Sequence, residues 1–89
     1  MIDAADEEEL TPLRDRLHAA HRALGVAYDT RDALAEEARD AGVGPGAVVR
    51  PELVLALASA ERAVLAAEAE MKDAEYALAM AEDARAGRR

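Results

Sequence analysis

The residues best suited to chemistry in this 89-residue chain are its two histidines, His18 and His21, preceded at the same spacing by Asp15. In a helix, an Asp-x-x-His-x-x-His pattern could offer ligands to a metal ion. The di-metal sites of helical bundles also take Glu-x-x-His motifs from other helices, and this sequence contains none. We therefore expect no metal site, and we expect both histidines to lie on a solvent-exposed helix face.

Candidate nucleophiles are scarce. The chain has no cysteine, and apart from two tyrosines its hydroxyl groups are those of Thr11, Thr30 and Ser59. A catalytic nucleophile needs a neighbouring base and a group that orients that base, and no such pattern accompanies these three residues. We expect no catalytic residue and no cofactor, and we predict that the chain is not an enzyme.

The glycine-rich segment at residues 42–46 reads Gly-Val-Gly-Pro-Gly. It does not have the chemistry of a phosphate-binding loop, because it lacks the Gly-Lys-Ser/Thr ending and does not follow a strand. It instead separates two long segments rich in Ala, Leu, Glu and Arg, which favour helices. We interpret it as the connection between two helices.

Residues at the edges of these segments suit helix ends. Thr11 suits an N-cap and Pro12 a first helical position, while Gly42 suits the left-handed residue that ends a helix. Pro51 and Gly87 bound the second segment in the same way. The predicted elements of this single domain are an acidic leader (1–11), a helix (12–41), a loop (42–50), a helix (51–86) and a basic tail (87–89). The leader is either a short helix of its own or a frayed extension of the first helix.

Apolar residues recur along both predicted helices at alternating spacings of three and four, a pattern typical of coiled coils. We call these positions the seam. Its large side chains are Leu13, Leu17, Leu24, Leu34, Leu53, Leu57, Val64, Met71 and Leu78. In the second helix every other seam position is alanine, and small residues at this spacing let two helices approach closely. A short connection makes the helices antiparallel neighbours, so we predict an all-α fold: an antiparallel two-helix hairpin, or Ala-rich coiled coil.

A second apolar face is expected on the helix at residues 51–86. Leu55, Leu65, Tyr76 and Met80 fall within about 80° of one another and roughly opposite the seam; we call them the outer stripe. A fainter counterpart on the first helix has Val26 between two alanines at a spacing of seven. Because helical stability comes mostly from packing, we expect the hairpin to be completed by oligomerisation or by docking on a protein partner.

The composition narrows the setting further. The net charge of −8 does not suit phosphate backbones, which proteins neutralise with Lys and Arg, so we do not expect nucleic acid as a partner. The longest apolar run, residues 53–58, is far shorter than the ~20 residues of a membrane span. The acidic start has no basic or apolar segment typical of a signal peptide. We expect a cytoplasmic protein, or one incorporated in a virion.

Opposite charges gather at the two ends of the chain. Residues 1–9 carry five carboxylates, and the last five residues carry three arginines. An antiparallel hairpin places these ends side by side, and each charge type also complements the dipole of its own helix. We therefore expect the two ends to attract each other.

Residues 38–50 read Ala-Arg-Asp-Ala-Gly-Val-Gly-Pro-Gly-Ala-Val-Val-Arg. This segment resembles the helix-turn-helix of bacterial repressors, which often runs Ala-x-x-Ala-Gly-Val, four residues, then a branched apolar residue before an Arg. The resemblance implies a recognition helix near residues 44–50 that places Arg50 at DNA. A small DNA-binding regulator is therefore an alternative function.

Other resemblances concern the whole chain. Its length and helix–turn–helix plan are similar to the secreted WXG-type hairpins of bacterial type VII systems, although the turn has no tryptophan. Its short, acidic, helical character is similar to phage scaffolding and accessory virion proteins. The charge of −8 also fits an acidic inhibitor or DNA mimic. Our leading hypothesis is a non-enzymatic structural or protein-interaction module, a helical-hairpin subunit of a larger assembly.

Overall fold

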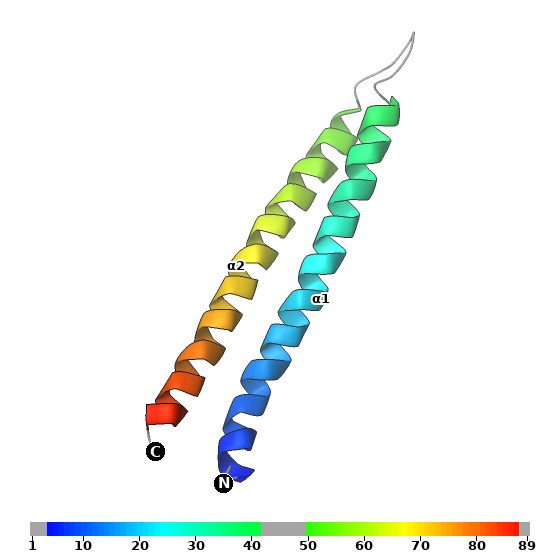
Figure 1. The fold of residues 1–89 in the computed structure, drawn as a ribbon. Coiled ribbons are helices and arrows are strands. Elements are labelled where there is room, and N and C mark those ends of the chain that lie inside the picture. Colours follow the sequence, from blue (N-terminus) through cyan, green and yellow to red (C-terminus); the bar gives the residue numbers. More distant parts are fainter. Residues whose placement is uncertain (1–3, 42–49, 88–89) are drawn as a thin grey trace.

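The computed structural model describes residues 4–41 and 50–87, with side chains from residue 8 onward. These residues form two helices, α1 (Ala4–Ala41) and α2 (Pro51–Gly87), and no strand. Figure 1 shows the helices packed side by side and antiparallel, with the start of α1 and the end of α2 at the same end. The predicted all-α, two-helix hairpin is confirmed.

Helix α1 begins earlier than the sequence suggests. The Thr11-Pro12 pair predicts a start at Pro12, but the helix begins at Ala4 and Pro12 lies inside it. A proline within a helix removes one backbone hydrogen bond and crowds the carbonyl four residues earlier. The preceding residues offset this cost, because Ala, Glu and Leu favour helices and Leu10 is buried against the rest of the hairpin. Residues 4–11 of the acidic leader are thus continuous with the first helix.

Helix α2 begins at Pro51, where the backbone carbonyl of Arg50 accepts hydrogen bonds from the amides of Leu53 (3.0 Å) and Val54 (3.2 Å). Proline suits the first helical position because its missing N–H would have no partner there. Glu52 lies in the first turn, where a negative charge complements the helix dipole. The start of α2 is therefore fixed by local chemistry.

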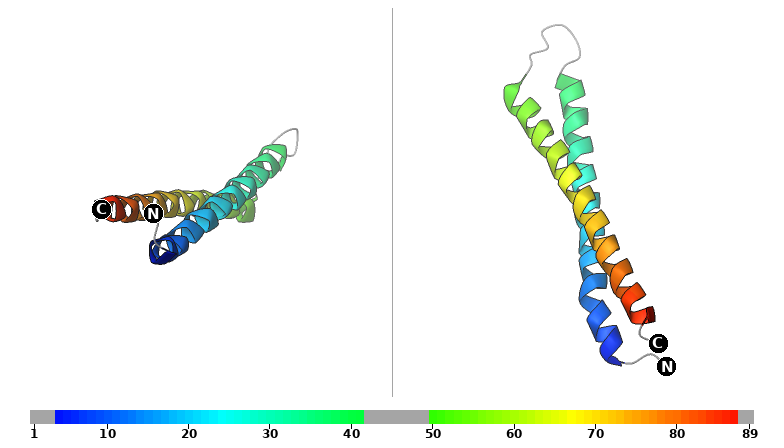
Figure 2. Two further views of the ribbon diagram at one scale, coloured as in Figure 1. Left: turned by 60° about the horizontal axis from the view of Figure 1, so that its bottom comes forward. Right: turned by 90° about the vertical axis from the view of Figure 1, so that its left-hand side faces the viewer.

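The hairpin is a thin rod with extents of 69 × 15 × 15 Å, and its two helices cross each other (Figure 2). Its core includes a cluster of Ala20, Met71 and Ala74, against which Leu17 and Leu24 pack. Alanine at two of these positions brings the helix backbones close together. No described residue is both large and fully buried, so the core is narrow.

Burial is uneven along the seam. The buried apolar residues are Leu10, Ala20, Leu53, Ala60, Val64, Met71 and Ala74. The remaining large seam residues Leu13, Leu17, Leu24, Leu34, Leu57 and Leu78 are half-buried. Full burial of a leucine side chain stabilises the folded state by about 1.5–3 kcal/mol. Each of these half-buried leucines therefore contributes less than this to stability.

No helix in the described part of the chain is both long and apolar enough to cross a membrane.

Candidate interaction surface

The outer stripe lies in solvent. Leu55, Leu65 and Tyr76 are 69%, 66% and 68% exposed, and Met80 is 51% exposed. Leu55 and Tyr76 are three heptads apart, a distance of about 32 Å along the helix. The stripe is therefore a long, narrow ridge on α2, and its shape suits contact with another helix better than enclosure of a small molecule.

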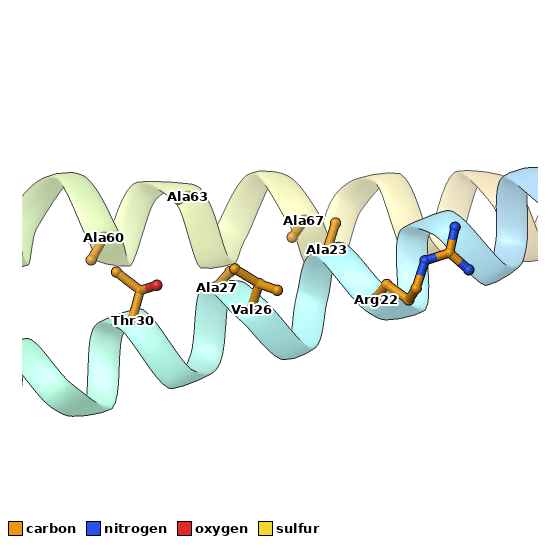
Figure 3. A pocket seen from close by; sticks show the side chains of 8 residues that line it. All are labelled: Arg22, Ala23, Val26, Ala27, Thr30, Ala60, Ala63 and Ala67. Atoms are coloured by element: carbon orange, nitrogen blue, oxygen red, sulfur yellow. The ribbon is translucent and has the colours of Figure 1, made fainter.

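A second apolar surface is a groove between the helices, with a volume of about 660 Å³. It is lined by Arg22, Ala23, Val26, Ala27, Thr30, Ala60, Ala63 and Ala67. Figure 3 shows these residues on the middle of α1 and on the facing part of α2, with the Arg22 side chain extending away from the alanines. The groove exists because alanines stand beside the seam on both helices, and methyl groups leave the space between the helices unfilled.

Sequence reasoning missed this groove. The sequence feature that could have indicated it is the pair Ala23 and Ala63. Each lies next to a seam position, where a longer side chain usually covers the contact between two helices. Val26, part of the fainter apolar row on the first helix, lies at its rim and is 65% exposed.

A bidentate ion pair joins the two helices between the groove and the chain ends. The Arg16 guanidinium donates from Nε to Glu70 Oε2 (2.9 Å) and from Nη2 to Glu70 Oε1 (2.7 Å). Arg16 is one heptad before the groove residue Ala23, and Glu70 is one heptad after Ala63. These hydrogen bonds hold the pKa of Glu70 below its usual value and raise the pKa of Arg16.

The other side of the seam carries a different polar contact. The Tyr28 hydroxyl donates to Glu68 Oε2 at 3.0 Å. The Arg31 guanidinium lies 5.0 Å from the centre of the Tyr28 ring, a cation–π distance, and it also donates to Asp32 Oδ1. The hydrogen bond to Glu68 raises the pKa of Tyr28, since it favours the protonated phenol. Polar contacts therefore join the helices on this side at Tyr28, whereas on the groove side the Arg16–Glu70 pair joins them nearer the chain ends.

The Arg16–Glu70 pair makes stability depend on pH in a defined direction. Because the folded-state pKa of Glu70 is lowered, its ionised form stabilises the fold above the unfolded-state pKa, and this contribution is lost as pH falls through the folded-state pKa. We expect the Tm of the wild type to exceed that of Glu70→Gln at pH 7, and the gap to close as pH falls below the ordinary value of 4.5. The gap is small, because the two side chains are 40% and 47% exposed and solvent screens the pair.

Thermal melts of both proteins by circular dichroism from pH 7 to pH 2 measure this gap directly. Subtracting the two curves removes the contribution of the other carboxylates, which titrate in both proteins. A gap that stays constant across this range would contradict the assignment of the pair.

The helix-turn-helix-like segment is described only in part, because residues 42–49 lie outside the described residues. At its end, the Arg50 guanidinium lies 3.3 Å from Glu52 Oε1 and 4.0 Å from Glu37 Oε1. The residue that the resemblance places at DNA is therefore paired with two carboxylates of the hairpin itself. The expected attraction between the chain ends also falls largely outside the described side chains.

Both histidines are exposed on α1. Among the described residues, no group of three or more His, Cys, Asp or Glu side chains is placed to hold a metal ion.

Comparison with protein-family models, curated proteins and solved structures found no match.

Proposed function

We propose that this chain is a non-enzymatic structural or protein-interaction module, a helical-hairpin subunit of a larger assembly. The observation that carries the proposal is the outer stripe, four large apolar side chains on α2 that are each at least half exposed. These side chains are aligned on one face of α2 over about 32 Å, and an apolar row that the hairpin itself does not cover favours contact with a partner.

The narrow core supports the same proposal. A chain of this size buries too little surface to be comfortably stable alone, and among the described side chains three of the seven buried apolar residues are alanines. A protein partner that covered the outer stripe would add the burial that the hairpin lacks. Within this class we favour an accessory or scaffold-like virion protein on grounds of its short, acidic, helical composition, acting in the cytoplasm or incorporated in the virion.

Native mass spectrometry of the full chain, taken from its source without denaturation, tests the proposal. We expect the chain in complexes heavier than its 9.5 kDa. The double variant Leu65→Glu with Tyr76→Glu should be absent from these complexes. Its affinity for the partner should fall about 30-fold or more, because two charges would have to be desolvated at the interface. A wild-type chain that is a stably folded monomer in its source would overturn the proposal.

A matched control adds the same two charges elsewhere. His18→Glu with Gly25→Glu places both on the exposed face of α1, and a side chain at Gly25 meets nothing within 4 Å. This variant should remain in the complexes.

The variant Arg50→Ala distinguishes the proposed function from the DNA-binding alternative. It should leave assembly unchanged, whereas a helix-turn-helix regulator with this substitution would lose DNA binding in a gel shift.

A further inference from the structure

The outer face of α2 carries charged residues as well as the outer stripe. Eighteen residues make five full turns of a helix, so Arg62 lies on the same line of α2 as Met80, and Asp73 lies on the same line as Leu55. Both charged residues are exposed, and α1 packs along one side of α2 (Figure 1). A basic and an acidic side chain therefore stand among the exposed apolar residues of this face.

The order of these four residues along α2 is symmetrical. Leu55 and Arg62 are seven residues apart, Arg62 and Asp73 are eleven apart, and Asp73 and Met80 are again seven apart. If two copies of α2 lie antiparallel about an axis between positions 67 and 68, Leu55 meets Met80 and Arg62 meets Asp73, each of them twice. The outer face is thus complementary in charge to a second copy of itself.

We propose that the outer stripe is covered by the outer stripe of a second copy of this chain. The two α2 helices are antiparallel and related by a two-fold axis perpendicular to them, and the two α1 helices lie on the outside of the dimer. This inference rests on the proposed function, because it uses the same surface, and it names the partner and the register of the contact.

A second pair of charges follows the same symmetry. Glu61 directly precedes Arg62, and Lys72 directly precedes Asp73, so both lie along the same edge of the outer face. A perpendicular two-fold axis brings each edge of one helix against the same edge of the other helix. Glu61 therefore meets Lys72 of the second copy, within about one residue of the height at which Arg62 meets Asp73.

These four charges are not used by the hairpin itself. Among the side chains described in residues 8–41 and 50–87, no ion pair is formed by Glu61, Arg62, Lys72 or Asp73, which are all exposed. Asp73 acts electrostatically on Arg16, but the carboxylate that pairs with Arg16 is that of Glu70. The second copy therefore supplies an opposite charge to each of the four without displacing an ion pair.

The sizes of the facing side chains are complementary as well. About the same axis, and within one residue of exact symmetry, Leu65 stands opposite Ala69 and Tyr76 stands opposite Ala58. Each large side chain thus meets a methyl group instead of another large side chain. Small residues at these positions let the two helix backbones approach closely.

A parallel arrangement, with the two-fold axis along the rod, lacks this complementarity. It places every residue opposite its own copy, so Arg62 meets Arg62, Lys72 meets Lys72 and Asp73 meets Asp73. It also places Tyr76 against Tyr76 and alanine against alanine. Because like charges in contact suppress an arrangement, the outer face favours antiparallel helices.

Other antiparallel registers lose the ion pairs. A shift of one helical turn places Asp73 opposite Ala58 in one direction and opposite Leu65 in the other, where its carboxylate would lose water without gaining a partner. In the proposed register Glu52 of one copy reaches the height of Asp83 of the other, but these positions are about 140° apart around the helix and lie on opposite edges of the face. Complementary charge therefore fixes both orientation and register.

The extent of the contact indicates a weak dimer. It runs from Leu55 to Met80, roughly 40 Å along a helix about 10–12 Å wide, and so covers roughly 400 Å² on each copy. A standard interface buries about 800 Å² on each partner. We therefore expect a dissociation constant on the order of tens to hundreds of micromolar and a monomer at a few micromolar.

Sedimentation equilibrium of the purified chain at about 5–1,000 μM tests the association. We expect the average mass to rise with concentration from the chain mass of 9.5 kDa toward twice that value. Leu65→Glu with Tyr76→Glu should abolish this rise, whereas the control His18→Glu with Gly25→Glu, which adds two charges to α1, should not. A folded wild-type monomer up to the highest concentration overturns the inference.

Charge reversals test the register. Arg62→Asp and Asp73→Arg should each weaken the dimer about tenfold, because each creates two contacts between like charges, and the double reversal should restore the wild-type dissociation constant. Net charge alone predicts otherwise, since Asp73→Arg reduces the charge of −8 and would strengthen association. Arg22→Asp, on exposed α1, is the matched control for Arg62→Asp. A double reversal that fails to restore the dimer overturns the register.

A spin label tests the orientation. The chain has no cysteine, so Glu82→Cys provides one attachment site, which is exposed and, two residues after Met80, lies on the far side of α2 from the outer stripe. Position 82 is about fifteen residues from the proposed axis, so antiparallel helices predict about 45 Å or more between the two labels. Parallel helices predict less than about 25 Å, and this shorter distance would contradict the proposed dimer.

The inference and the proposed function fail separately. If the purified chain stays monomeric while Leu65→Glu with Tyr76→Glu is absent from the complexes in its source, the outer stripe binds a different protein and only the inference is wrong. If the purified chain dimerises in the expected register but the wild type is a monomer in its source, only the proposed function is wrong.

Discussion

Replacing Met71 with alanine is expected to lower the free energy of unfolding by about 2–4 kcal/mol. Met71 is 8% exposed and belongs to the core cluster with Ala20 and Ala74, against which Leu17 and Leu24 pack. Its removal forfeits the transfer free energy of the side chain and leaves a void that two alanines cannot fill. In a core this narrow, that loss is a large share of the total stability of a small domain.

Urea denaturation followed by circular dichroism, at one fixed protein concentration, measures the change. Leu65→Ala is the matched control, because it truncates a side chain of similar size that is 66% exposed. In the purified chain it should change stability by less than about 0.5 kcal/mol. Equal losses in the two variants would contradict the placement of Met71 in the core.

The two-helix architecture could be predicted from sequence because its causes are local. A spacing of three and four residues fixes one apolar side on each helix, and the segment at residues 42–50 interrupts both helices with Gly and Pro. The start of α1 could not be placed this way. Thr11 and Pro12 have the local chemistry of a helix start, but the burial of Leu10 is a tertiary effect, and it favours continuation of the helix through the proline.

The candidate surfaces also divide into one that follows from local sequence and others that depend on how the helices pack. The outer stripe follows from angles around one helix, so Leu55 and Tyr76 could be expected together. The groove and the Arg16–Glu70 pair depend on how the two helices are offset along their length. The seam allows several offsets, and only the packed structure shows that Arg16 reaches Glu70 and that alanines face one another beside the seam.

The alanines of the core are expected to be as sensitive to enlargement as Met71 is to truncation. Ala74 is 1% exposed, so Ala74→Leu must push the helices apart or force neighbouring side chains out of their rotamers. Overpacking of this kind costs about 1–3 kcal/mol. Ala79→Leu is the matched control, because Ala79 is exposed on the same helix and leucine is nearly as good a helix former as alanine.

The double variant Met71→Ala with Ala74→Leu decides whether these effects arise from one packed site. Met71 and Ala74 belong to one cluster, so the leucine added at one position can occupy part of the space vacated at the other. We expect the double variant to lose about 1–2 kcal/mol less than the sum of the single losses, since neighbouring core residues couple. Strict additivity in the same urea titrations would mean that the two side chains do not share a cavity, and it would contradict the close approach of the helices at this point. Recovery would instead show that the spacing between the helices is set by the total volume of this cluster, which is why alanine occupies it.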